Sequence, residues 1–368
     1  MTLDITYTEV DQGMIFPPGL GGSPIAVIAS DGTSGSSLTV GDVYLFNTPQ
    51  EAAAQCKAGG DLLNYINGSS DGTIKGVFNE GGQYGNTQAL GINMVYAIPI
   101  PTSATADDYT AAIALAENLP NMMGTVEIYP KLSDSTILAS LSAHFSNMAG
   151  YGDVRVGVAT VVTDAEISAM NTEIENLTTD RLAVTADPTT TGILGTKIGC
   201  TIYSDDPAKG AYRSNPTIMN WTGTDLHNLR DDAICADFQG INGPQPYMVV
   251  TPAYKSVSGV RSTAGLMHSR RNMDQHILQL FNYAAAVKYT NNTQDARNNL
   301  QTLLNTYFNR ELQKQTIEDF TVNVLIDNNT PFGLSISLYV RVTGAIYQIS
   351  ISGNMLTPTG YVVTVEGD

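Results

Sequence analysis

The chain has 368 residues, of which 42% are apolar and only 14% are charged, and its formal net charge is −17. This length predicts two or three domains, and the charged fraction, well below the about 25% of typical soluble domains, favours a protein that packs against copies of itself. The sequence lacks an apolar stretch of transmembrane length, and the acidic start Met1–Asp4 lacks the apolar region of a secretory signal, so we expect neither a membrane span nor export by that route.

The charge is distributed unevenly along the chain. Residues 1–254 carry a net charge of −18, residues 255–314 carry +5, and residues 315–368 carry −4. Such asymmetry predicts a charged partner for the basic segment, the alternative being a helix whose basic side chains are simply solvated. The three cysteines, Cys56, Cys200 and Cys235, are odd in number and far apart, which predicts reduced core residues.

The first predicted element is a strand over residues 2–10. Leu3, Ile5 and Tyr7 alternate with polar residues, a period of two. A Pro/Gly-rich stretch at 16–22 follows and predicts a hinge. Because an isolated strand is not stable, this strand must pair with a distant part of its own chain or with another chain.

The next region alternates strands with helices. The predicted strands are 25–29, 42–46, 94–100, 125–129, 154–161 and 181–185. The predicted helices are 49–57, 106–119, 133–148 and 164–177. This alternation predicts an α/β fold with a mainly parallel sheet.

The pattern changes after about residue 255. Two long helices are predicted, 265–289 and 293–313, the second with an apolar stripe formed by Leu300, Leu303, Leu304, Tyr307, Phe308 and Leu312. Strands are predicted at 320–326, 334–342 and 345–351, the last two joined as a hairpin at Thr343–Gly344.

The last predicted strand, 361–365, lies behind a second Pro/Gly hinge at 358–360 and contains Tyr361, Val363 and Val365. Both ends of the chain are therefore predicted to be detached strands.

No pattern of catalytic or ligand-binding residues emerges. His144, His227, His268 and His276 have no spacing suited to zinc. A phosphate-binding loop and a serine nucleophile elbow are also missing. We therefore expect no catalytic residues, no cofactor and no metal, and a protein that is not an enzyme.

Two segments leave alternatives open. Asp205–Asp206–Pro207 is typical of a helix or loop cap, with a calcium-binding turn as the alternative. The basic helix 261–288 is a candidate for nucleic acid, but its aromatic residues Phe281 and Tyr283 lie away from its arginine pair and the chain is acidic, so we expect no such binding.

Several passages are similar to those of the contractile tail sheath family. They are 202–216, the Gly-Ile-Asn at 240–242, residues 258–263, the helix 267–281 with its paired arginines, and the turn Phe78–Gly82. The tryptophan of the family's Trp-Gly-x-Arg-Thr segment is absent here, and the segment before Asn215–Pro216 is looser. The resemblance covers most of the chain, loosely in residues 100–195.

This resemblance implies a fold and a division into domains. It implies an α/β outer part with a subtilisin-like topology and no protease activity, and an α+β inner domain with extended β arms at both termini. The implied boundaries are an arm and hinge at 1–20, the outward-facing α/β part at 21–255, the inner domain at 256–355 and a second arm at 356–368.

The implied function is a structural subunit that polymerises around an inner tube and contracts to drive the tube through the target envelope. The implied partners are further copies of the chain in stacked rings, the tail tube protein, and baseplate and tail terminator proteins. The implied location is a virion tail or another contractile particle, assembled in the host cytoplasm. The alternatives are a non-contractile self-assembling virion or filament protein and, more remotely, a hydrolase.

Within the resemblance, the arm residues are Leu3, Ile5 and Tyr7 at the start of the chain and Tyr361, Val363 and Val365 at its end. The basic residues Arg261, Arg270 and Arg271 are predicted to face the tube, through contacts to carboxylates. The alternative is that these arginines contact a neighbouring copy of the chain.

Overall fold

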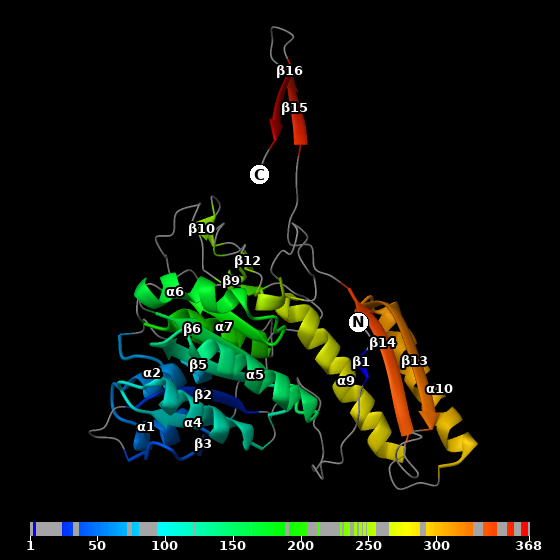
Figure 1. The fold of residues 1–368 in the computed structure, drawn as a ribbon, viewed down its shortest axis with the longest axis horizontal. Helices are drawn as coiled ribbons and strands as arrows, with labels where there is room; N and C mark the ends of the chain where they lie inside the picture. Colours follow the sequence, from blue (N-terminus) through cyan, green and yellow to red (C-terminus); the bar gives the residue numbers. More distant parts are fainter. Residues whose placement is uncertain are drawn as a thin grey trace.

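In its described residues, the computed structural model has two layered lobes joined by a long helix, with a hairpin standing apart (Figure 1). It describes residues 3–4, 24–31, 37–71, 76–80, 94–120, 122–162, 164–187, 191–204, 212–213, 229, 232–235, 239–240, 243–244, 246–247, 249–254, 265–287, 292–326, 334–343, 352–356 and 362–366.

The larger lobe is built on a seven-stranded sheet. Its strands, in spatial order, are β3 (Tyr44–Phe46), β4 (Val95–Ile100), β2 (Ile25–Ser30), β5 (Val126–Leu132), β6 (Val156–Val161), β7 (Leu182–Ala186) and β9 (Ile234–Cys235). All neighbours are parallel except β3 and β4, which are antiparallel. The predicted α/β fold with a mainly parallel sheet is thus confirmed.

Both faces of this sheet are buried, as expected for parallel strands covered by helices. In β2, Ile25 and Val27 belong to one apolar core and Ala26 and Ile28 to the other. One core is closed by α1 (Pro49–Gln55), α2 (Asp61–Asn67), α3 (Val77–Glu80) and α7 (Ile193–Ser204). The other is closed by α4 (Ala106–Glu117), α5 (Ile137–Gly150) and α6 (Asp164–Glu175).

Helix starts follow from capping residues in the sequence. Thr105 and Asp108 form a capping box at α4, in which each side chain accepts the other residue's backbone N–H. Thr48 caps α1 with Pro49 at its first position, and Thr293 caps α10 (Gln294–Gln313). These caps fix the starts close to the predicted positions.

The smaller lobe packs α10 on an antiparallel pair, β13 (Ile317–Ile326) and β14 (Leu334–Val342). The strand predicted at 320–326 thus begins three residues earlier, and its partner is 334–342. The hairpin predicted at Thr343–Gly344 requires residues 345–351, which lie outside the described residues.

The helix α9 (Met267–Val287) joins the two lobes, running diagonally from the larger to the smaller in Figure 1. Met273, Ile277 and Leu278 pack with Val154 of the larger lobe. Leu280 packs in the core of the smaller lobe with residues of α10 and β13. The predicted domain boundaries near residues 20 and 255 lie outside the described residues.

Short elements complete the described chain. They are β8 (Tyr212–Arg213), paired with β12 (Pro246–Tyr247), β10 (Gln239–Gly240), paired with β11 (Gly243–Pro244), and the 3₁₀ turn η1 (Pro252–Tyr254).

Candidate functional site

The first residues of the chain extend the sheet of the smaller lobe. The strand β1 (Leu3–Asp4) pairs antiparallel with β14, with Leu3 opposite Leu338 and Asp4 opposite Ser337. The sheet order is therefore β1, β14, β13. Sequence reasoning predicted that this strand pairs with a distant segment or with another chain, and here it pairs within one chain. Ile5 and Tyr7 lie outside the described residues.

The last described residues form a hairpin of their own. The strand β15 (Ser352–Leu356) pairs with β16 (Val362–Glu366), with Met355 opposite Val363 and Gly353 opposite Val365. The sequence predicted that the final strand is isolated, and this prediction was wrong, because β16 pairs with β15 of the same chain. Figure 1 shows the hairpin standing away from both layered lobes. Tyr361 lies outside the described residues.

The strand β13 forms the other edge of the β1–β14–β13 sheet. A strand edge presents unpaired backbone N–H and C=O groups that a further strand can join. At one end of β13, Leu325 is 55% exposed and Ile326 is also exposed. At the other end, the exposed Glu318 and Asp319 lie 3.6 Å from Arg341. Gln301 of α10 already bridges the middle of this edge, donating to the carbonyl of Val322 and accepting from the N–H of Val324, each at 2.7 Å. The end of the strand beyond this bridge, with Leu325 and Ile326 exposed, has the features of a strand-addition surface.

The arginine pair of the basic segment is buried. Arg270 is 5% exposed and Arg271 is 8% exposed, whereas the prediction that they face a tube needs accessible guanidinium groups. Both belong to the half of α9 that lies against the larger lobe, and Arg271 lies within electrostatic reach of Tyr203 on α7. In this structure the two side chains are therefore placed inside the chain, and Arg261 lies outside the described residues.

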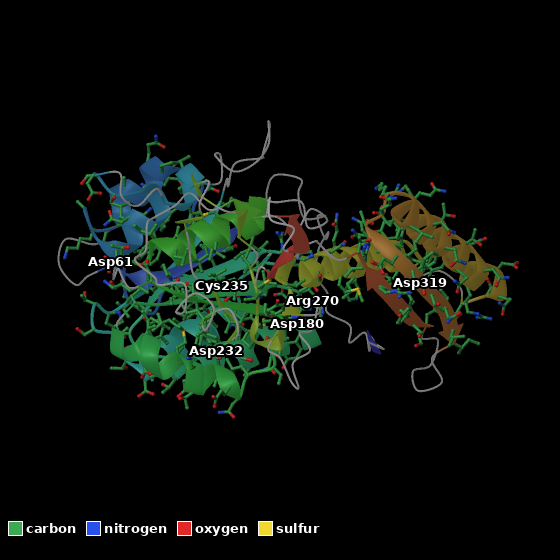
Figure 2. All side chains as sticks on the ribbon, turned by 90° about the horizontal axis from the view of Figure 1, so that it is seen from above. Asp61, Asp180, Asp232, Cys235, Arg270 and Asp319 are labelled. Atoms are coloured by element: carbon green, nitrogen blue, oxygen red, sulfur yellow. The ribbon has the colours of Figure 1, made fainter. Side chains whose placement is uncertain are left out.

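Arg270 has two acidic partners within the chain. Its Nε lies 3.0 Å from Oδ1 of Asp274, one helical turn further on, and its Nη1 lies 3.1 Å from Oδ2 of Asp180. Asp274 also receives two parallel hydrogen bonds from Arg181, of 2.8 and 2.9 Å. Figure 2 shows Arg270 and Asp180 next to each other where α9 meets the larger lobe.

We call Asp180, Arg181, Arg270 and Asp274 the joint cluster. Burial opposes ionisation of Asp274, but the charges of Arg181 and Arg270 and their hydrogen bonds outweigh it and lower its pKa. Burial likewise opposes the charge of Arg270, while Asp274 and Asp180 raise its pKa. The cluster thus joins two carboxylates to two guanidinium groups and has no net charge at neutral pH.

Sequence reasoning missed three members of this cluster. Asp274 stands four residues after Arg270, a spacing that brings two side chains together on a helix. That spacing was a usable signal. Asp180 and Arg181, just before β7, carried no local signal of their own because they lie 90 or more residues away from their partners.

A second buried charge cluster lies inside the larger lobe. Glu127 on β5 accepts a 2.7 Å hydrogen bond from Arg155, its carboxylate lies 3.0 Å from Nε2 of His144, and Arg155 also pairs with Asp153. Tyr129 donates to Glu127 at 3.0 Å. Burial opposes the charge of Glu127, but His144 and Arg155 lower its pKa. The partners of this cluster are all supplied by the chain, so it is a structural core feature.

The arrangement of nucleophiles and histidines in the described part of the chain gives no basis for assigning a catalytic site. His268 Nε2 lies 3.3 Å from Ser269 Oγ, but both residues are buried, and among the described residues no hydrogen bond orients the other ring nitrogen of His268. Burial, with a contribution from Asp31, raises the pKa of Cys56 to about 12, so this thiol is protonated at neutral pH. His227 and Asp205–Pro207 lie outside the described residues.

Among the described residues, no group of three or more potential metal ligands gathers in one place. Nor does any described helix have the length and hydropathy needed to span a bilayer.

The chain was compared with family models, curated proteins and solved structures. No family model and no curated protein matches it. Among solved structures it is similar to the helical sheath of the anti-feeding prophage in its contracted state, with a TM-score of 0.60 and 13% identity over 94% of this chain and 96% of that one. It is also similar to the sheath tail protein of Desulfitobacterium hafniense, with a TM-score of 0.56 and 12% identity over 97% and 100% of the two chains.

A third similar structure is the contracted PVC sheath complex of an extracellular contractile injection system. It has a TM-score of 0.58 and 10% identity over 94% of this chain and 96% of that one. At these identities the likeness concerns the fold, and it extends over nearly the full length of both chains. The resemblance noted in the sequence is confirmed at this level: the chain has the fold of contractile tail sheath proteins.

Proposed function

We propose that this chain is the subunit of a contractile tail sheath, which polymerises around an inner tube and contracts to drive it through a target envelope. The observation that carries the proposal is the extent of the fold match. It covers both layered lobes and nearly the whole length of sheath proteins, two of them in contracted assemblies. A match to the α/β sheet alone would have left many functions open, because that architecture serves many unrelated proteins.

We further propose that the terminal strands link the subunits. The pairing of β1 with β14 is held by two residue pairs. A strand pairing this short can be exchanged for the same pairing with a neighbouring chain at little cost. The hairpin β15–β16 stands clear of the layered lobes and can reach, in another copy, the part of the β13 edge that Gln301 does not bridge. Leu3, Ile5, Tyr7, Tyr361, Val363 and Val365 are the arm residues of this proposal.

Such links suit a contractile machine because backbone ladders hold two chains together while their domains rotate. The Pro/Gly stretch at 16–22, between β1 and the larger lobe, takes up the change in orientation, whereas 358–360 connects the paired strands β15 and β16 and moves with the hairpin. The extended sheath is then a metastable packing of the same subunits, and no nucleotide is required. The partners are further copies of this chain, the tube, baseplate and terminator proteins of an extracellular or phage-tail particle.

The test removes one arm at a time. Deletion of residues 1–15, or of 358–368, should leave a folded subunit that sediments as a monomer and forms no tubes. The control lengthens the hinge near Gly19–Gly22, which should permit assembly and weaken contraction. Normal tubes from either deleted chain would contradict the linking role of that arm.

We also propose that the basic segment contacts the tube through exposed cations. Arg310 and Lys314 at the end of α10 are 59% and 54% exposed, which supports this role, and Arg261 is retained from the sequence. Both side chains also pair with the buried Glu311, so glutamine is used to remove the cations without adding carboxylates beside it. The double change Arg310→Gln and Lys314→Gln should leave polymerisation of the sheath alone intact and weaken assembly around the tube. Loss of polymerisation without the tube would assign these residues to a sheath–sheath contact.

A further inference from the structure

The helix α9 determines how the two layered lobes are oriented. Its first half lies against the larger lobe through the joint cluster and through Met273, Ile277 and Leu278, an apolar cluster against which Val340 and Val342 of β14 also pack. Its second half belongs to the smaller lobe, where Leu280 is buried among residues of α10 and β13. Any tilt of α9 against the larger lobe therefore moves the whole β1–β14–β13 sheet.

Contacts on the other side fix α9 to the smaller lobe. Asn272 donates a 2.9 Å hydrogen bond to the carbonyl of Thr316, at the start of β13. His276 and Tyr307 of α10 are hydrogen-bonded at 2.8 Å. Because of these contacts α9 and the smaller lobe form a single unit, so the movable contact is the one between α9 and the larger lobe.

Two kinds of contact hold α9 to the larger lobe, and they differ in how strongly their energy depends on the angle between the helix and the lobe. Apolar contacts such as Ile277 and Leu278 against Val154 favour burial at any angle that keeps the surfaces together. The planar guanidinium of Arg181 meets the Asp274 carboxylate in two parallel hydrogen bonds, which constrain both distance and angle. Arg270 adds a further geometric constraint, because its guanidinium is hydrogen-bonded to both Asp274 on α9 and Asp180 on the larger lobe.

The backbone that carries Asp180 and Arg181 is itself fixed in the larger lobe. Gly157 on β6 donates to the carbonyl of Arg181 at 2.8 Å, and Ala253 donates to the carbonyl of Thr179 at 3.0 Å. The acidic and basic groups that receive α9 are thus held by the sheet and not by a loose loop.

We infer that the joint cluster of Asp180, Arg181, Arg270 and Asp274 is a positioning device that sets the angle between the α/β lobe and the lobe that carries the terminal strands. A 21-residue helix is about 30 Å long, so a tilt of about 10° displaces its far end by about 5 Å. That is about the spacing of neighbouring strands, about 4.8 Å, and is enough to lose a strand pairing with another chain. This consequence for assembly rests on the proposed sheath function, whereas the fixed angle does not.

The test measures a distance between the two lobes directly. Spin labels at Ala143→Cys on α5 and Asn299→Cys, near the start of α10 and the far end of α9, occupy exposed helix positions, while Cys56, Cys200 and Cys235 are buried. The labelled chain is diluted into unlabelled chain, so that double electron–electron resonance reports distances within one molecule. The Asp274→Asn variant should broaden the distance distribution by about 5 Å, as for a tilt of about 10°.

The matched control is Glu127→Gln, which also neutralises a buried carboxylate bridging two basic side chains, but inside the larger lobe. It should lower stability and leave the distance distribution as in the unchanged protein. A narrow, unshifted distribution for Asp274→Asn would overturn the inference and assign the angle to the apolar contacts. If Asp274→Asn does not fold, Arg270→Gln takes its place, with the same broadening expected and the same unshifted result overturning it.

Assembly of the variants separates this inference from the proposed function. If the unchanged chain forms tubes and Asp274→Asn does not, both stand. If the unchanged chain forms no tubes while Asp274→Asn broadens the distance distribution, the role of the joint cluster in setting the angle is supported and the proposed sheath function is wrong.

Discussion

Acidification should destabilise the protein through one buried histidine, His276. This side chain is 1% exposed between α9 and α10, with its ring beside Tyr307 and Phe308. The pKa of His276 is lowered to about 4, mainly by burial. The charge of Glu311 raises this pKa by a smaller amount, and the charge of Lys314 lowers it slightly. His276 is therefore neutral in the folded protein at pH 7, and its ring nitrogen Nδ1 is hydrogen-bonded to Tyr307.

The sign and size of the effect follow from linkage. In the unfolded chain the pKa of His276 returns to 6.5, so between pH 6.5 and about 4 the unfolded state binds a proton that the folded state does not. Stability from this group is complete above pH 6.5 and is lost as the pH falls toward 4. The loss amounts to about 2 kcal/mol at pH 5 and about 3 kcal/mol once the folded protein is also protonated.

The assay is urea unfolding followed by circular dichroism at pH 7.5 and pH 5, for the unchanged protein and for His276→Gln. Glutamine cannot ionise but can keep a hydrogen bond to Tyr307, and every other titrating group is common to both proteins. The free energy of unfolding should therefore fall by about 2 kcal/mol more in the unchanged protein than in the variant. An equal fall in both would refute the assignment of a buried, neutral His276.

Three further predictions concern the core and the arms. Gly157→Ala should destabilise the larger lobe by about 1–3 kcal/mol, because the added Cβ would overlap the ring of Phe145. Gly150→Ala is the control, since open space surrounds that position, and the midpoints of urea unfolding compare the two variants. Arg155→Met should lower the free energy of unfolding by about 3–5 kcal/mol, because it leaves buried Glu127 with one partner fewer. The exposed Arg341→Met should lower it by less than about 1 kcal/mol, and a smaller difference between the two variants would contradict the buried ion pair. Removing residues 358–368 should leave the melting temperature unchanged, because β15–β16 stands clear of both cores, and a large decrease would show that it packs on them.

The elements that sequence predicted well are those with a strong period and clear caps. The helix predicted at 293–313 is observed at Gln294–Gln313, with Thr293 as its cap. Its predicted stripe was too wide, because Leu303 and Leu312 are exposed while Leu300 and Leu304 are buried. A period identifies the face of a helix, but the width of the buried face depends on the neighbour that covers it.

The helix α7 was not predicted because its sequence has poor helix formers. Gly195 and Gly199, with Thr196 and Thr201, lower its intrinsic helix propensity. The structure gives the reason for the glycines: a Cβ at Gly199 would lie 2.5 Å from Ile128, and one at Gly195 would overlap Thr160. Close packing against β5 and β6 therefore overrides local propensity.

The placement of the charged residues could be predicted least. The net charge of +5 over residues 255–314 treats Arg270 as a free cation, whereas Asp180, 90 residues earlier, and Asp274 both pair with it. Period-two patterns likewise predicted terminal strands without identifying Met355 as the neighbour of Val363. Partners that are distant in the sequence are set by the fold and are not encoded in any local pattern.

Negative-stain electron microscopy of the purified full-length chain, alone and with its tube, distinguishes a contractile sheath from other kinds of protein. A sheath subunit should form hollow cylinders of two diameters, the narrower one around the tube and the wider, contracted one from the chain alone. Monomers under all assembly conditions, or solid filaments of one diameter with or without the tube, would contradict the sheath function.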